Sequence, residues 1–351
     1  MKRVIAIAMQ KGGVGKTTTA VNLAASLAAT KRRVLLIDMD PQGNTTMGSG
    51  IDKSQLKCST CEVLLGECQL ADAFVPIEHG AGFTLLPANQ DLTAAEVRLL
   101  TLPIGRETKL RQALAPKRND FDLVLFDCPP ALNMLTVNAL VAADSVLIPM
   151  QCEYYALEGL SALLSTVEQI RAAVNPQLAI EGVLRTMFDP RNNLANEVSA
   201  QLVAHFGDKV FRTVIPRNIR LAEAPSFGKP ALFHDKESRG ALAYLALAGE
   251  MIRREEESTG AVRNLTAMTS ATAASPVTAP TAPTASAANA TAANTTNTAN
   301  TTNAANAGNA VDTNGVDTAT TAGPATNPAS GSAMSAPVSA APAPQAEERS
   351  R

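Results

Sequence analysis

The sequence predicts an α/β fold with a mainly parallel β-sheet and helices on both faces. Short apolar runs recur along the first part of the chain, and segments with apolar residues at helical spacing lie between them. A glycine-rich stretch, residues 11–18, joins the first apolar run directly to the first helical segment. Sheets of this kind bind ligands at the carboxyl ends of their strands, so we expect functional residues there.

The expected strands are short runs bounded by turn residues, and the expected helices show apolar residues three to four positions apart. The strands are residues 4–8, 33–37, 83–86, 123–126, 145–149, 181–187 and 210–215. The clearest helices are residues 17–29, 157–173, 195–205 and 241–254. The apolar stretch 131–150 contains Asn133, Asn138 and Asp144, which indicates a helix followed by a buried strand rather than a membrane span.

Composition divides the 351 residues into two parts. Residues 1–258 mix apolar runs, charges and turn signals and predict one packed domain. Residues 259–351 consist largely of Ala, Thr, Asn, Pro and Ser and have no aromatic residue. Such a segment buries too little apolar surface to offset its conformational entropy, so we predict a disordered low-complexity tail.

Charge and the N-terminal segment restrict the possible partners. The formal charge is −2, and the acids of the tail leave the first part close to neutral, so any nucleic-acid contact requires a local basic patch. The first apolar run ends at Gln10 and is too short for a signal-peptide core. We therefore expect a cytoplasmic protein that does not enter a membrane.

Five cysteines in such a chain do not suggest a disulfide framework. Cys58 and Cys61 have the spacing of a zinc ligand pair, and Cys68 and His79 lie nearby. No second ligand pair follows at the usual distance, so small apolar side chains on a surface segment are the preferred interpretation.

The glycine-rich stretch predicts a phosphate-binding P-loop, because a strand precedes it and a helix begins within it. Its glycines let backbone amides turn toward phosphate oxygens, and the helix start adds a positive dipole end. In this interpretation Lys16 contacts the β and γ phosphates of ATP, and Thr17 offers its hydroxyl to Mg²⁺. The predicted nucleotide-binding residues are Lys11, Gly12, Gly13, Val14, Gly15, Lys16, Thr17 and Thr18.

Three aspartates follow predicted strands and supply acidic groups for the same site. Asp127 ends the strand at 123–126 and is the expected Walker B carboxylate, which positions Mg²⁺ through its water shell. Asp38 and Asp40 follow the strand at 33–37. Asp40 is the candidate for orienting the attacking water, and Asp38 is expected to support Mg²⁺ through water.

Lys11 departs from the ordinary P-loop pattern, which requires no charge at that position. A cation there is able to approach the γ phosphate held by a neighbouring subunit, as an arginine finger does in trans. The alternative is a solvated loop lysine.

Across residues 1–255 the sequence resembles the deviant Walker A ATPases, and among them the chromosome-partitioning ParA/Soj family. The resemblance rests on several motifs in order: Lys11-Gly-Gly-Val-Gly-Lys-Thr-Thr-Thr19, Asp38-Met-Asp-Pro-Gln-Gly-Asn44, Asp127-Cys-Pro-Pro130, the segment 151–159 and Ile215-Pro-Arg-Asn-Ile-Arg-Leu-Ala-Glu-Ala-Pro225. It implies an ATP-sandwich homodimer, completed by Lys11 across the interface and associated with the nucleoid. A ParB-like partner then stimulates ATP hydrolysis and release from DNA.

The resemblance also implies further site residues. Pro216 and Asn218 match positions at the adenine base, although Pro and Asn also favour a plain turn. Arg191 and Arg220 match positions that contact double-stranded DNA without sequence preference, and Arg217 lies in the same basic region. Without the resemblance these arginines are equally well explained as a solvated charged face.

Other classes fit the sequence less well. A MinD-type cell-division or cargo-positioning ATPase ends in a basic amphipathic helix, which we do not expect after residues 255–257, all glutamates. An iron–sulfur reductase with the same nucleotide core needs cysteines that ligate a cluster between two subunits. Cys128 and Cys152 are single cysteines far apart in the sequence, which does not favour this class. A module that binds nucleotide without hydrolysis does not need the lysines and aspartates that this sequence retains, which are Lys11, Lys16, Asp40 and Asp127.

The first strand begins near the N-terminus, so sequence-specific operator binding is not expected. The sequence does not distinguish a chromosome from a plasmid or another cargo.

Overall fold

The computed structural model contains one eight-stranded sheet in the order β3-β4-β2-β5-β1-β6-β7-β8. It describes residues 2–78, 82–154 and 156–273, with side chains as far as residue 257. Every neighbouring pair of strands is parallel except β3 with β4. The central strand β1 pairs with β5 on one side and β6 on the other, so the loop after β1 starts in the middle of the sheet.

All the expected strands are present. The strands are β1 (Arg3–Ile7), β2 (Val34–Asp38), β3 (Val75–Ile77), β4 (Phe83–Leu86), β5 (Leu123–Asp127), β6 (Ser145–Gln151), β7 (Ala179–Phe188) and β8 (Val210–Pro216). Sequence patterns missed only β3, a short edge strand that contains Pro76 and pairs antiparallel with β4. Proline is tolerated at a sheet edge, because no further strand needs its missing N–H.

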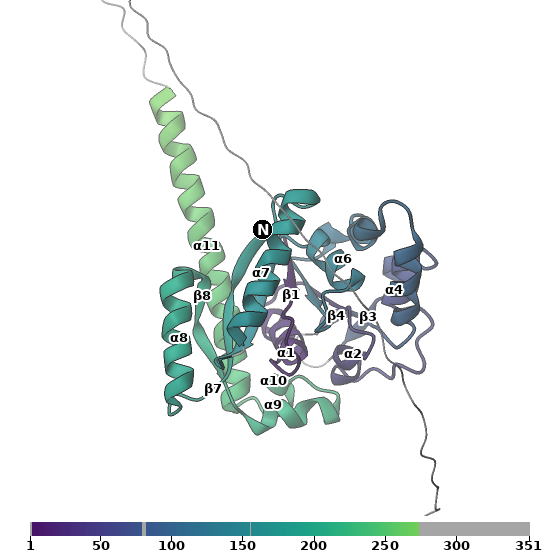
Figure 1. Ribbon diagram of the computed structural model, residues 1–351, viewed down its shortest axis with the longest axis horizontal. Coiled ribbons are helices and arrows are strands. Elements are labelled where there is room, and N and C mark those ends of the chain that lie inside the picture. Colours follow the sequence, from purple (N-terminus) through teal and green to yellow (C-terminus); the bar gives the residue numbers. More distant parts are fainter. Residues whose placement is uncertain (1, 79–81, 155, 274–351) are drawn as a thin grey trace, which may run out of the picture. The chain divides into compact units, whose positions relative to one another are not determined.

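Helices cover both faces of the sheet, as expected for buried parallel strands (Figure 1). The helices are α1 (Lys16–Ala29), α2 (Asn44–Gly48), α3 (Thr60–Leu65), α4 (Leu92–Thr101), α5 (Lys109–Leu114), α6 (Met134–Ala142), α7 (Ala156–Ala173), α8 (Asn193–Phe206), α9 (Ile219–Glu223), α10 (Ala231–His234) and α11 (Arg239–Ala273). Helices α1 and α11 pack in one hydrophobic core with Ile5 and Ile7 of β1. Helices α3 to α8 pack in the other core with Val4 and Ala6. Alternate residues of one strand therefore anchor the two opposite layers.

The apolar stretch 131–150 forms α6 and most of β6, which confirms its interpretation as a helix followed by a buried strand. Within the described ranges, no helix is both long enough and apolar enough to cross a membrane.

Helix α11 continues beyond both the expected end at residue 254 and the predicted domain boundary at residue 258. Buried Tyr244, Leu247 and Met251 anchor its first part against α1 and the sheet. The acidic run 255–257 was expected to end the helix, but Glu and Arg have high helix propensity, and the helix continues through this run. The predicted low-complexity tail from residue 274 onward lies outside the described residues.

The expectation of no disulfide was wrong, because the structure joins Cys58 to Cys68 with Cα atoms 6.4 Å apart. Helix α3 lies between them, starting at a capping box on Ser59 and ending at Gly66 in a left-handed conformation. This short helix folds the chain back on itself, which brings the flanking cysteines together. Cys61 is free but buried, whereas it was expected as a small apolar side chain on a surface segment, and His79 lies outside the described residues.

Candidate functional site

The loop after β1 turns directly into α1, as the phosphate-site interpretation requires. Gly13 and Gly15 have φ angles of 74° and 88°, the left-handed region that side chains disfavour. Gly15 is the N-cap of α1 and provides no side-chain acceptor for the first helical amides. Those amides therefore remain available to an anion, at the positive end of the helix dipole.

Lys16, the first residue of α1, is only 7 % exposed. Its Nζ donates to the carbonyl oxygen of Lys11 at 3.1 Å, which holds the ammonium over the loop. Burial lowers the pKa of Lys16, and the nearby carboxylate of Asp127 partly offsets this effect. A buried ammonium beside open backbone amides is suited to an anionic ligand.

Asp127 ends β5 beneath the loop and is completely buried. Its Oδ2 accepts hydrogen bonds from Thr17 Oγ1 at 2.8 Å and from Thr45 Oγ1 at 2.7 Å. Its Oδ1 has no hydrogen-bond partner among the described residues, an arrangement that is costly unless a water or ion binds there. The Thr17 hydroxyl and this carboxylate therefore fit a divalent cation that keeps part of its water shell.

Asp38 ends β2 beside Asp127, since the two residues are register partners in adjacent strands. The hydroxyl and the amide of Thr46 both donate to Asp38 Oδ2, at 2.7 and 2.9 Å. Burial raises the pKa of both aspartates, and for Asp38 the neighbouring Asp127 raises it further. Two buried carboxyl groups side by side favour a bound cation, which offsets their mutual repulsion.

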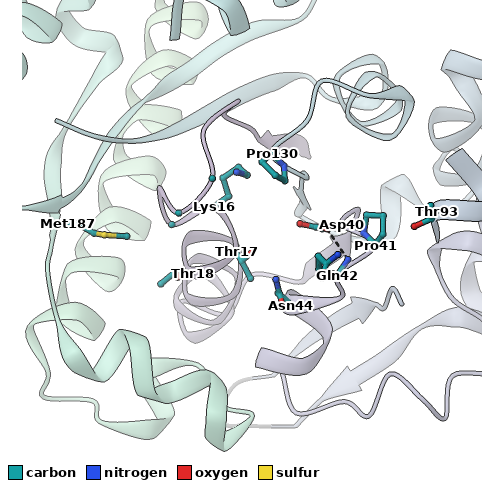
Figure 2. A pocket seen from close by; sticks show the side chains of 13 residues that line it. Lys16, Thr17, Thr18, Asp40, Pro41, Gln42, Asn44, Thr93, Pro130 and Met187 are labelled. Atoms are coloured by element: carbon teal, nitrogen blue, oxygen red, sulfur yellow. Dashed lines mark hydrogen bonds between the residues drawn. The ribbon is translucent and has the colours of Figure 1, made fainter. Parts of the chain in front are cut away.

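These groups surround a pocket of about 600 Å³ at the carboxyl edge of the sheet (Figure 2). The predicted residues that line it are Gly12, Gly13, Gly15, Lys16, Thr17, Thr18 and Asp40. Asp40 faces the pocket while its Oδ1 accepts from the amide of Gln42 at 3.0 Å. The buried residues Val14, Asp38 and Asp127 are absent from this lining and support the loop from within.

Lys11 is not among the residues that line the pocket. Its Nζ forms an ion pair of 2.6 Å with Glu153, and the side chains are 32 % and 51 % exposed. An exposed pair of this kind contributes little to stability and opens easily. Lys11 is therefore available to another partner at the surface.

The predicted adenine residues lie one strand away from the pocket. Pro216 ends β8 and pairs in register with Phe188 of β7. The Asn218 side chain caps α9 by accepting from the amide of Leu221 at 3.3 Å. Neither residue belongs to the pocket lining, so their assignment to adenine stays a prediction.

The predicted DNA-contacting arginines lie on the segments that follow β7 and β8, at the same edge of the sheet as the pocket. Arg191 pairs with Asp189 at 2.8 Å, and its side chain is 88 % exposed. Arg220 pairs with Glu223 at 2.8 Å and with Asp235 at 3.2 Å. Arg217 is exposed and forms no ion pair with the described residues.

Sequence reasoning missed several residues of the site, among them Thr93 of α4, which lines the pocket. Thr45 and Thr46 hold Asp127 and Asp38, and the only signal was two hydroxyl residues directly after the motif at 38–44. Met187 lines the pocket from the end of β7, and no sequence motif marks it.

No group of three or more His, Cys, Asp or Glu side chains that could hold a metal ion occurs in the described part of the chain. A cation bound to phosphate does not need such a group of side chains, because phosphate, hydroxyl and water oxygens supply most of its ligands.

Cys128 and Cys152 are buried and free, which suits core packing better than an iron–sulfur cluster shared between subunits.

Comparison with known proteins identifies the family. A family model described as an AAA domain matches residues 2–180. The chromosome partitioning protein ParA of Caulobacter vibrioides is 52 % identical over 257 residues, which cover 73 % of this chain and 96 % of that protein. The sporulation initiation inhibitor protein Soj of Bacillus subtilis is 49 % identical, covering 72 % and 98 %. This chain belongs to the ParA/Soj family.

A solved structure of similar fold agrees with this family assignment. It is the cobyrinic acid a,c-diamide synthase of Mycobacterium smegmatis, crystallised with ADP and magnesium, and it is 40 % identical to this chain. The TM-score is 0.64, and the match covers 74 % of this chain and 97 % of that one. ParA/Soj proteins are P-loop ATPases, so this chain is an ATPase of that general class.

Proposed function

We propose that this chain is a DNA-partitioning ATPase whose ATP-bound homodimer binds double-stranded DNA without sequence preference. A ParB-like partner stimulates hydrolysis and releases the dimer, and repeated cycles segregate a chromosome or plasmid. The observation that carries the proposal is the combination of a phosphate pocket with Lys11, a surface cation that pairs with the exposed Glu153 among the residues that the structure describes.

Within the pocket, each residue has a proposed role in binding ATP and Mg²⁺. The open amides of α1 and the ammonium of Lys16 bind the β and γ phosphates. Thr17 supplies a hydroxyl to the cation, while Asp127 and Asp38 hold its water ligands. Bound Mg²⁺ offsets the negative charge that develops on the phosphate oxygens.

For hydrolysis, Asp40 is the proposed residue that orients and deprotonates the attacking water. Its carboxylate faces the pocket near the phosphate loop (Figure 2). Lys11 leaves Glu153 and stabilises the transferring phosphoryl group in the partner subunit. ATP thus controls dimerisation and also supplies the phosphoryl group that is hydrolysed. The protein is proposed to be cytoplasmic and to reside on the nucleoid.

For DNA, exposed Arg191, Arg217 and Arg220 are the proposed phosphate contacts. They follow two adjacent parallel strands, so they lie along the same edge of the sheet. The ion pairs of Arg191 and Arg220 are exposed and easily exchanged for phosphate oxygens. Contacts of this kind carry no sequence information, as the proposal requires.

The substitution Arg220→Glu tests the DNA contact. We expect it to weaken DNA binding about tenfold or more at moderate salt and to flatten the salt dependence, because a phosphate contact is replaced by repulsion. ATP-dependent dimerisation should stay intact. The measurement is DNA affinity across a salt series, with light scattering in ATP.

Arg171→Glu is the matched control, because Arg171 also pairs with a glutamate three positions away, Glu168. It lies in the last turn of α7, at the opposite edge of the sheet. Arg220→Ala removes the cation without adding repulsion against Glu223. Equal loss of dimerisation and DNA binding in both Arg220 variants would assign this arginine a structural role instead.

A further inference from the structure

Met187 has a backbone conformation that side chains disfavour. Its φ angle is 49°, and among the described residues Lys31 is the other non-glycine residue with a positive φ. Met187 lies near the end of β7, where the register with β8 shifts between Arg185 and Phe188. Strained residues of this kind persist where the surrounding structure holds them, and they are concentrated at ligand sites.

The residue before Met187 fixes β7 against the phosphate loop. Thr186 is 2 % exposed, and its hydroxyl donates to the carbonyl oxygen of Val14 at 2.8 Å. In a regular strand the next side chain points to the opposite face. The left-handed backbone at Met187 interrupts that alternation, and Met187 lines the same pocket as Gly15 and Thr18.

Met187 lines the pocket at some distance from the residues proposed to act on the terminal phosphate. In Figure 2, Met187 lies on the other side of the start of α1 from Asp40 and Pro130. Asp40 marks the end where the terminal phosphate reacts in the proposed function. A nucleotide that extends from there past Thr18 brings its base toward Met187, so the strained side chain lies at the base end.

The Met187 side chain is held in place and is chemically suited to an aromatic ring. Gln151, the last residue of β6, donates from Nε2 to the sulfur of Met187 at 2.7 Å. A thioether is polarizable and packs well against aromatic rings. The neighbouring lining residues Gly15 and Thr18 offer little apolar surface by comparison.

We propose that Met187 binds the purine base of the nucleotide by packing its thioether on the ring, and that the left-handed backbone serves to place it there. This inference rests on the proposed nucleotide binding and adds a contact on β7. It is independent of Pro216 and Asn218 on the β8 side.

The test compares Met187→Ala with the unaltered full-length chain for binding of ATP, ADP and inorganic tripolyphosphate, all with Mg²⁺. Loss of the apolar contact should raise the Kd for ATP and ADP about tenfold. The affinity for tripolyphosphate, measured by displacement of a fluorescent ATP analogue, should change less than about twofold, because it has no base.

Two further variants separate the side chain from the strain. Met187→Leu keeps an apolar side chain and should bind ATP nearly as well as methionine. Met187→Gly removes the side chain but also the strain, so it should bind ATP weakly while its Tm is not lowered.

Equal weakening of ATP and tripolyphosphate by Met187→Ala would show that the residue acts on the phosphate loop and would overturn the inference. Normal ATP affinity in Met187→Gly would overturn it as well. An unaltered chain that binds no ATP would overturn the proposed function together with this inference.

Discussion

Lys16→Ala is expected to abolish detectable ATP binding and hydrolysis. Lys16 is buried at the start of α1, and its ammonium lies over the phosphate loop and close enough to Asp127 to interact with its charge. Several charge-assisted hydrogen bonds to phosphate disappear together, so the Kd for ATP should rise about a hundredfold or more. Calorimetric titration with Mg-ATP and a steady-state ATPase assay measure both effects.

Lys117→Ala is the control for Lys16→Ala. Lys117 is an exposed lysine paired with Asp120 just before β5, at the edge of the sheet opposite the pocket. Its removal should leave binding and turnover unchanged. If Lys16→Ala folds normally and still binds ATP as tightly as the unaltered chain, the pocket around Lys16 is not the ATP-binding site.

Asp40→Ala should separate binding from hydrolysis. Asp40 faces the pocket but makes no described bond to the phosphate loop, so ATP affinity should change little. Loss of the group that positions the attacking water should reduce kcat about a hundredfold or more. Because the ATP state then persists, the variant should remain a dimer on DNA.

Single-turnover hydrolysis and light scattering with ATP measure the two effects of Asp40→Ala. Asp52→Ala provides a control, since Asp52 is an exposed aspartate in the following loop that bonds only nearby residues such as Ser54. Normal turnover in Asp40→Ala would remove Asp40 from the mechanism.

The sheet was predictable because its strands are buried on both faces and therefore read as continuous apolar runs. Strands such as β1 and β5 supply side chains to both cores, which leaves a clear pattern. The short edge strand β3 has too few residues for such a pattern. The extension of α11 past residue 258 was not predicted, because the sequence there lacks the apolar periodicity by which helices were recognised.

The candidate site was predictable wherever a short motif places its own residues. The loop at 12–18 brings Lys16 and Thr17 to one helix start, and strand ends place Asp38 and Asp127 beneath it. Pairings across long separations were not predictable. The strained conformation of Met187 depends on how β7 meets β8, and the disulfide of Cys58 depends on the fold of α3.

The central claim is that ATP switches this protein onto DNA. The most direct measurement is co-sedimentation of the purified chain with two DNA fragments of unrelated sequence, in ATP, ADP or no nucleotide, with ATPase activity recorded in parallel. We predict that the protein sediments with both fragments in ATP and with neither in ADP or without nucleotide. Binding that does not depend on ATP, or no binding under any condition, would contradict the partitioning mechanism.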